Sequence, residues 1–142
     1  MATQPTSGPR PTTCPCGQLG TLMQCCGPII ANERPAMTAE ELMRSRYSAF
    51  ALGQTEPALD AAAHLLRSWD PDTRPGHIGF EPGRVWTGLE VVATEGGGAL
   101  DATGIVHFRA SFTDSGSAET LTERSSFRRV DGRWVYVAGI RP

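Results

Sequence analysis

The hydrophobic and polar positions divide the chain into a helical part followed by a strand-rich part. Over residues 38–53 the apolar side chains recur at intervals of three and four, which indicates a helix with one buried face. Thr38 and Glu41 form a capping box at its start, and a glycine stands at its end. A second helix is predicted over residues 55–69, because the proline near its start is tolerated in a first helical turn. Two prolines and a glycine in residues 70–76 then end it.

From Arg84 onward the pattern changes to one that is typical of strands. Val106, Phe108 and Ala110 alternate with polar residues, so one face of their strand is expected to be buried. Glycine- and aspartate-rich turns separate four such segments, which cover residues 84–95, 102–113, 119–130 and 133–140. Helices followed by an antiparallel meander predict an α+β domain, in which two helices pack on one curved sheet.

Composition and charge narrow the class of protein. Hydrophobic residues make up 39% and charged residues 20%, as in a soluble globular protein, and the net charge of -2 gives no general attraction to nucleic acid or anionic membranes. Arg124, Arg128 and Arg129 form too small a basic stripe to change that expectation. No stretch approaches the roughly 20 apolar residues that span a bilayer, and no secretory signal is visible. We therefore expect a cytoplasmic protein with neither a membrane nor a nucleic acid as its partner.

All four cysteines fall in a short segment near the N-terminus, at positions 14, 16, 25 and 26. Three interpretations compete for them. Disulfides require an oxidising compartment, which the absence of an export signal disfavours. A reactive thiol requires a helix N-terminus or cationic neighbours to lower its pKa, and no charged residue lies between Thr12 and Ile30.

Metal binding is the interpretation that fits the spacing best. Tetrahedral Zn²⁺ takes four thiolates, and two close pairs joined by a short loop can supply them. Cys14, Cys16, Cys25 and Cys26 are therefore the predicted ligands. Four protein ligands leave no coordination position for water or substrate, so the predicted zinc site is structural. The same thiolates also bind iron, and the sequence leaves that alternative open.

At these residues the chain resembles a known family. The segment "CPCG…CCGP" resembles the SEC-C motif, a small metal-binding knuckle. The segments "TAEELMRSRYSAF", "SWDPDTRP", "WTGLEV", "LTERSSF" and "DGRWVYVAG" are similar to the YchJ family of uncharacterised bacterial proteins. The resemblance implies a cysteine-ligated zinc and a cone-shaped nuclear transport factor 2-like domain, and it brings no assigned reaction. It gives three parts: a flexible leader (1–13), a SEC-C-like knuckle (14–30) and the α+β cone (31–142).

The chain departs from the family at two places, and the functional roles of the family's residues there do not transfer to it. The usual knuckle loop reads "GSGKKY", whereas residues 17–23 contain no basic side chain, so docking to an acidic partner does not transfer. The family tends to have "TWHP" where residues 68–71 read "SWDP", so no role for a histidine transfers either.

A cone-shaped fold of this type implies a pocket between its helices and its sheet. The side chains predicted to line it are Arg44, Arg46, Tyr47, Trp69, Glu123 and Ser125. Glu123 alternates in step with apolar residues, so burial would leave its carboxylate in need of a partner such as Arg44 or Arg46. A structural ion pair, a ligand site and a general base all remain open for Glu123.

Two hypotheses about function follow. The first is a zinc-knuckle protein that acts as a binding or adaptor module for another protein, with no catalytic residue. The second is a small-molecule-binding protein or enzyme that uses the cone pocket near Glu123.

Overall fold

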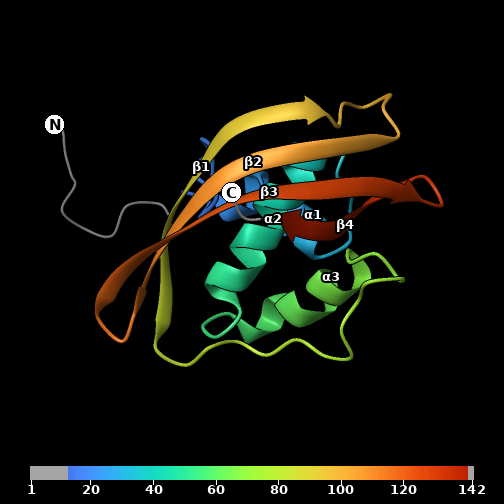
Figure 1. Cartoon of the computed structure of the whole chain (residues 1–142). Helices are drawn as coiled ribbons and strands as arrows, with labels where there is room; N and C mark the ends of the chain where they lie inside the picture. Colours follow the sequence, from blue (N-terminus) through green and yellow to red (C-terminus); the bar gives the residue numbers. More distant parts are fainter. Residues whose placement is uncertain (1–12, 141–142) are drawn as a thin grey trace, which may run out of the picture.

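The computed structural model describes residues 13–140, and nearly all of the predicted leader lies outside them. Three helices and two 3₁₀ turns precede four long strands (Figure 1). In chain order these elements are η1 (Leu22–Gln24), α1 (Gly27–Ile30), α2 (Ala39–Leu52), η2 (Pro57–Leu59), α3 (Ala61–Arg67), β1 (Arg84–Gly96), β2 (Thr103–Asp114), β3 (Ser117–Val130) and β4 (Arg133–Ile140). Within this part of the chain, no helix combines the length and apolar character that a membrane crossing requires.

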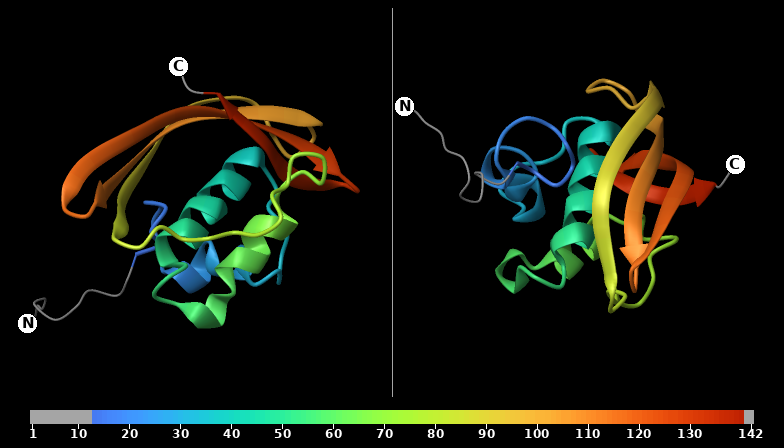
Figure 2. Two further views of the ribbon diagram at one scale, coloured as in Figure 1. Left: turned by 60° about the horizontal axis from the view of Figure 1, so that its bottom comes forward. Right: turned by 90° about the vertical axis from the view of Figure 1, so that its left-hand side faces the viewer.

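The four strands form one antiparallel sheet in the order β1-β2-β3-β4, as expected for a meander. The sheet curves around α2 and α3, and the knuckle (residues 14–30) lies on the side of α2 away from the sheet (Figure 2). The α+β fold, with helices on a curved antiparallel sheet behind an N-terminal cysteine cluster, is therefore confirmed.

The concave face of the sheet supplies the alternating apolar residues of the core. Val106, Phe108 and Ala110 of β2 are buried, as their alternation predicted. Phe108 pairs with Glu123 of β3, and Ser125 of β3 pairs with Gly139 of β4. The register thus brings polar Glu123 and Ser125 onto the same face as the apolar core of β2.

Helix α2 begins as its capping sequence predicted, with one difference. The Glu41 backbone N–H donates to Thr38 Oγ1 at 3.0 Å, which satisfies one free donor of the first turn. The Glu41 carboxylate accepts from the backbone N–H of Met37 at 2.7 Å, one residue before Thr38, whose N–H is the donor in a capping box. Glu41 therefore takes part in both hydrogen bonds of the cap, since it donates through its backbone N–H and accepts through its carboxylate.

The second predicted helix is interrupted, which corrects the expectation of one helix over residues 55–69. Asp60 has φ 52° and ψ 54°, a left-handed conformation that cannot continue a right-handed helix. A 3₁₀ turn at Pro57–Leu59 precedes this residue, and α3 begins directly after it at Ala61. The sequence does not predict the left-handed residue at Asp60. Glycine is the residue that usually marks this conformation, and aspartate adopts it less often.

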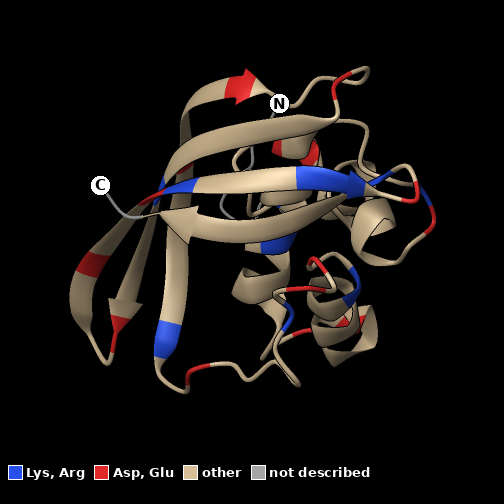
Figure 3. Cartoon of the chain, turned by 45° about the vertical axis from the view of Figure 1, so that its right-hand side comes forward, with Lys and Arg blue, Asp and Glu red and all other residues tan. Residues whose placement is uncertain are grey.

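Charged side chains of both signs are interspersed along the strands and loops (Figure 3). The three arginines of the basic stripe on β3 all have intramolecular partners. Arg124 pairs with Glu95 at 2.7 Å, Arg128 pairs with Asp70, and Arg129 donates to the carbonyl of Ala99 at 2.8 Å.

Candidate metal centre and cavity

Backbone hydrogen bonds shape the first half of the knuckle into a tight loop. The N–H of Cys14 donates to the carbonyl of Gly20 at 2.9 Å, and the N–H of Gly17 donates to the carbonyl of Cys14 at 3.0 Å. Gly17 and Gly20 have φ values of 91° and 105°, which side chains other than hydrogen rarely allow. The sequence therefore places glycine where the loop must reverse around the first two sulfurs.

The second cysteine pair lies where two short helical turns meet. Cys25 ends η1, and Cys26 stands at the start of α1, with Pro28 in the first turn. Adjacent side chains point to opposite faces of a strand, so this helical geometry is what allows both cysteines to face one centre.

The four sulfur atoms form a compact cluster. All four Sγ atoms lie within 4.8 Å of one another, with 3.6 Å between Cys16 and Cys25 and 3.9 Å between Cys25 and Cys26. Zinc–sulfur bonds of about 2.3 Å in a tetrahedron separate sulfurs by about 3.8 Å. All four cysteines are free thiols, and three of them are buried. The donor set and its spacing thus fit a tetrahedral thiolate metal site.

The crowding of the sulfurs also has an electrostatic consequence. Burial, with hydrogen bonding to Cys16 next, raises the pKa of the Cys25 thiol to about 12. Hydrogen bonds from Cys16 and Cys26 lower the pKa of Cys14 well below its ordinary value. The Cys14 sulfur is thus favoured as a thiolate, while Cys25 retains its proton. Four adjacent thiolates become favourable only when a cation neutralises them, and metal binding then releases the protons.

Arg44 belongs to the surroundings of this cluster and not to the cone pocket, which corrects the prediction. Its Nη1 donates to the carbonyl of Cys16 at 2.7 Å, and its Nε donates to Glu40 at 2.8 Å. Ser48, one helical turn further along α2, has its Oγ 3.6 Å from the sulfur of Cys14. The face of α2 that is turned away from the sheet therefore supports the cysteine cluster.

The other predicted pocket residues line one cavity of about 290 Å³ between α2 and the concave face of the sheet. They are Arg46, Tyr47, Trp69, Glu123 and Ser125. Most of the remaining wall is apolar and includes Met43, Phe50, Trp86, Phe108, Ala110, Leu121 and Phe127. Sequence reasoning did not identify Tyr136 and Arg84, which also line the cavity.

Glu123 does not pair with either arginine that the sequence suggested. Its Oε2 accepts from the hydroxyl of Ser125 at 2.9 Å, and among residues 13–140 it forms no ion pair. The carboxylate occupies the space that a side chain at Gly139 would fill on the neighbouring strand. Glu123 is half-buried, so the partners it lacks within the protein are available from water or from a ligand.

Arg46 is buried on α2 and lies between two aromatic rings. Its guanidinium carbon is 4.8 Å from the ring centre of Trp69 and 4.7 Å from that of Tyr136. Its Nη1 donates to the carbonyl of Leu65 at 2.8 Å and to the hydroxyl of Ser68 at 2.7 Å. Burial lowers the pKa of Arg46 to about 10, and the guanidinium remains charged at neutral pH.

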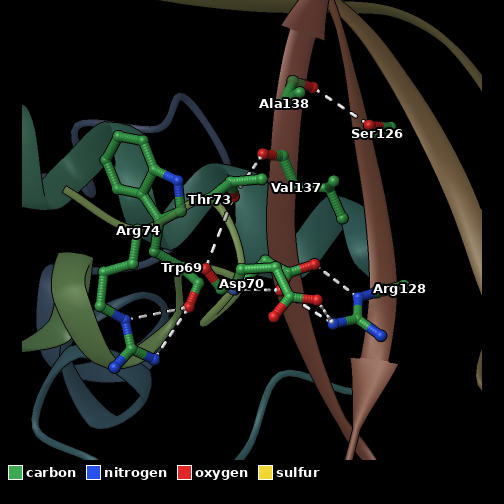
Figure 4. A network of polar contacts seen from close by, with 9 residues as sticks. Trp69, Asp70, Thr73, Arg74, Ser126, Arg128, Val137 and Ala138 are labelled. Atoms are coloured by element: carbon green, nitrogen blue, oxygen red, sulfur yellow. Dashed lines mark hydrogen bonds and ion pairs between the residues drawn. The ribbon is translucent and has the colours of Figure 1, made fainter.

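Asp70, which directly follows Trp69, joins the loop after α3 to β3 through Arg128 (Figure 4). Both of its oxygens accept from Arg128 of β3, and Arg128 Nη2 lies 2.8 Å from Oδ1. The neighbouring loop forms a parallel bridge to β4, because Asp70 N–H donates to the Tyr136 carbonyl and Tyr136 N–H donates to the Ser68 carbonyl. The network fixes Trp69 against Tyr136 and thereby fixes the rings on both sides of Arg46.

Comparisons with known proteins support this architecture. Residues 38–139 match the family model of the YchJ middle domain, which is nuclear transport factor 2-like. The chain is 47% identical over 126 residues to a UPF0225 protein of Streptomyces coelicolor, an alignment that covers 89% of this chain and 93% of the relative. It is 39% identical over 126 residues to a UPF0225 protein of Geobacter sulfurreducens, covering 89% of this chain and 77% of that one.

Two solved structures are similar over nearly the whole chain. The solution structure of a SEC-C motif containing protein from Rhodopseudomonas palustris superposes with a TM-score of 0.76 at 30% identity, covering 92% of this chain and 99% of the other. The crystal structure of a SEC-C motif containing protein from Psychrobacter arcticus gives a TM-score of 0.65 at 25% identity, covering 89% and 80%.

Proposed function

The chain belongs to the YchJ family, and from that premise we propose that it is a zinc-binding protein of the bacterial cytoplasm. Cys14, Cys16, Cys25 and Cys26 hold one Zn²⁺ in this proposal. The observation that carries it is the approach of all four sulfur atoms to within 4.8 Å of one another. The free state of all four thiols supports a reducing compartment, where cysteines serve as metal ligands.

The proposed role of the metal is structural. Four protein sulfurs complete a tetrahedral coordination sphere, so no position remains at which the metal could activate water or polarise a substrate. The zinc instead fixes a loop whose own secondary structure is limited to η1, a single turn of α1 and one β-bridge between Thr13 and Thr21. Small metal-bound segments of this kind depend on the metal for their shape.

Elemental analysis of protein purified without added metal tests the zinc proposal. We expect about one zinc per chain, since the site has a single set of four ligands. The double variant Cys14→Ser/Cys26→Ser should lose the zinc, whereas Ser126→Ala, a half-buried residue of β3 outside the knuckle, should retain it. Four freely titrating thiols without bound metal would contradict the proposal. Iron in place of zinc would leave the site intact and change only the identity of the metal.

We further propose that the metal-held loop contacts another protein, as an adaptor would. Two apolar side chains of the loop are exposed, Leu19 at 96% and Met23 at 63%. The loop carries no basic residue, in contrast to the cationic loop usual in the family, so a contact through it would rest on these two apolar side chains. Apolar contact surfaces are stabilised by removal from water, so a partner with an exposed apolar patch is the kind that fits.

The adaptor role is tested by affinity capture from a bacterial lysate with three forms of the protein. Capture of a specific partner by the zinc-loaded protein should be lost with Leu19→Ser/Met23→Ser, although the zinc content stays the same. Leu100→Ser is the matched control, because Leu100 is equally exposed (101%) but lies in the β1–β2 turn. A partner that is captured equally by all three proteins would contradict a role for the loop.

A further inference from the structure

The cone cavity contains a buried positive charge that no acidic side chain neutralises. Arg46 is only 6% exposed, and it forms no ion pair among residues 13–140. Buried charges in proteins are normally paired, because removal of an ion from water is strongly unfavourable. An unpaired guanidinium in a cavity wall is therefore unusual and calls for a partner.

The hydrogen bonds of Arg46 leave part of the guanidinium unused. Both protein acceptors, the Leu65 carbonyl and the Ser68 hydroxyl, bind Nη1. Within the described residues, Nε and Nη2 donate to no protein atom. These two nitrogens carry parallel N–H groups, and parallel N–H groups of arginine match the two oxygens of a carboxylate.

The other charged groups of the cavity do not supply that partner. Glu123 is hydrogen-bonded to Ser125 and lies against Gly139, outside ion-pair distance of Arg46. Arg84, the second arginine of the wall, already pairs with Asp114 at 3.2 Å. Arg46 is thus the cationic group of the cavity whose charge remains free for a ligand.

The rest of the wall indicates the shape of that ligand. Around Arg46 the cavity is bounded by the rings of Tyr47, Phe50, Trp86 and Phe108, as well as Trp69 and Tyr136. The indole N–H of Trp69 is buried and has no acceptor in the described part of the chain. A space of about 290 Å³ is at the small end of ligand pockets, and aromatic walls favour a flat apolar body.

We infer that the cone cavity binds a small aromatic monocarboxylate, whose carboxylate is held by Arg46 and whose ring packs between the aromatic walls. This inference is independent of the zinc site, because it concerns the opposite side of α2. The carboxylate neutralises the buried guanidinium, and the ring replaces water against the apolar surface. Preformed hydrogen bonds to Leu65 and Ser68 hold the guanidinium in place before the ligand enters.

Titration of the zinc-loaded full chain with benzoate tests the inference, with calorimetry and the indole N–H resonance of Trp69 as readouts. A ligand of about nine non-hydrogen atoms is expected to bind with a dissociation constant near 1 mM. Benzyl alcohol, which has the ring but no charge, should bind at least about tenfold more weakly. Saturable binding of benzoate with a shift of the Trp69 resonance supports the inference.

Variants then assign the binding to Arg46. Arg46→Met should weaken benzoate binding at least about tenfold, since it removes a charge-assisted hydrogen bond. Arg109→Met removes a positive charge from an exposed ion pair with Glu90 on the sheet and should leave binding unchanged. Glu123→Gln removes a negative charge from the same cavity and should strengthen benzoate binding.

Three results would overturn the inference. The first is the absence of saturable benzoate binding at about 10 mM, which is tenfold above the expected dissociation constant. The second is equal binding of benzoate and benzyl alcohol. The third is benzoate binding by Arg46→Met that equals that of the unchanged protein. If Arg46→Met fails to fold, the comparison of the two ligands and the effect of Glu123→Gln still decide. Zinc content, measured on the same samples, separates failure of this inference from failure of the zinc proposal.

Discussion

Gly139 makes room for the Glu123 carboxylate on the neighbouring strand. A Cβ at this position would overlap the carboxylate, although the backbone of Gly139 does not have a positive φ. The glycine is therefore required by close packing and not by an unusual turn. Its effect is to let a charged group lie flat against the sheet beside Ser125.

We predict that Gly139→Ala lowers the free energy of unfolding by about 1–3 kcal/mol, because an added methyl group forces the carboxylate or the strand to move. Urea denaturation with tryptophan fluorescence measures the change. Gly88→Ala on β1 is the matched control, since nothing lies within 4 Å of a Cβ built there. A Gly139→Ala protein as stable as this control would show that the carboxylate relocates freely.

Some contacts of single residues could be predicted from the sequence, and others could not. The alternation of β3 predicted that Glu123 shares a face with apolar residues, and it does. The sequence did not reveal its partner, because the choice between Ser125 and an arginine depends on which space Gly139 leaves open. The cluster of Arg46 with Trp69 and Tyr136 brings together three distant segments, and no local pattern encodes such a contact.

Asp60 separates η2 from α3 by a single left-handed residue. Its side chain makes no capping hydrogen bond, so the position gains little from aspartate. The left-handed conformation is unfavourable by roughly 1–2 kcal/mol for a residue with a Cβ, and glycine adopts it without this strain.

We predict that Asp60→Gly raises the free energy of unfolding by up to about 1 kcal/mol, because relief of strain exceeds the entropy lost by glycine. Thermal and urea unfolding provide the measurement. Ala62→Gly, within α3, should have the opposite sign and destabilise by about 1 kcal/mol. Equal destabilisation by both substitutions would contradict the argument from backbone strain.

The ion pair between Asp70 and Arg128 joins the loop after α3 to β3, and it makes stability depend on pH. Hydrogen bonding to Arg128 lowers the pKa of Asp70 from 3.8 to about 2 in the folded protein. The unfolded chain therefore takes up this proton first as the pH falls. The contribution of Asp70 is complete above its ordinary pKa and is lost as the pH falls through about 2.

We predict that Asp70→Asn is clearly less stable than the natural protein at a pH of about 5, and that the difference shrinks toward a pH of about 2. Urea midpoints of the two proteins across this range measure it. His64, whose pKa burial lowers to about 3, titrates in both proteins and cancels in the difference. Asp72→Asn, whose side chain is 83% exposed, should show only a small difference throughout. A difference for Asp70→Asn that does not vary with pH would contradict the ion-pair argument.

The elements differ in how well the sequence defines them. The strands and the start of α2 were predictable, since β-hairpin turns and a threonine cap are local signals. The break at Asp60 was not, because a left-handed aspartate has no distinctive neighbours. The second cysteine pair was predictable in outline, since adjacent cysteines that share a metal exclude a strand at that point.

In the whole molecule, α2 lies between the two candidate sites. These are the cysteine cluster of the predicted knuckle and the cavity of the predicted cone. One side of the helix supports the cysteine cluster, and the other lines the cavity through Arg46 and Tyr47. The buried core is continuous through the helix. It includes Cys14, Cys16, Cys26 and Ile30 together with Leu42, Met43, Tyr47, Val106, Phe108 and Phe127.

Continuity of the core leads us to predict that removal of the metal weakens the fold far from the cysteines. A ligand that binds only the folded state stabilises it by about 4 kcal/mol when its free concentration is about 1,000 times its dissociation constant. When the cation is removed, sulfurs of the cluster take up protons again and no longer share one centre, so the buried residues around them lose their fixed neighbours. The loss is expected to spread through α2 to the sheet.

The tryptophans give a direct measurement, because Trp69, Trp86 and Trp134 all lie outside the knuckle. Chelation of the metal should lower the urea midpoint seen by tryptophan fluorescence and by circular dichroism to the same extent. The variant Cys14→Ser/Cys26→Ser should already have the lower midpoint, and the chelator should not change it further. If fluorescence kept its original midpoint while the knuckle lost its metal, the cone would be stable by itself. The boundary at residue 31 would then separate two independent folding units, because a core shared across α2 requires both sides of the helix to unfold together.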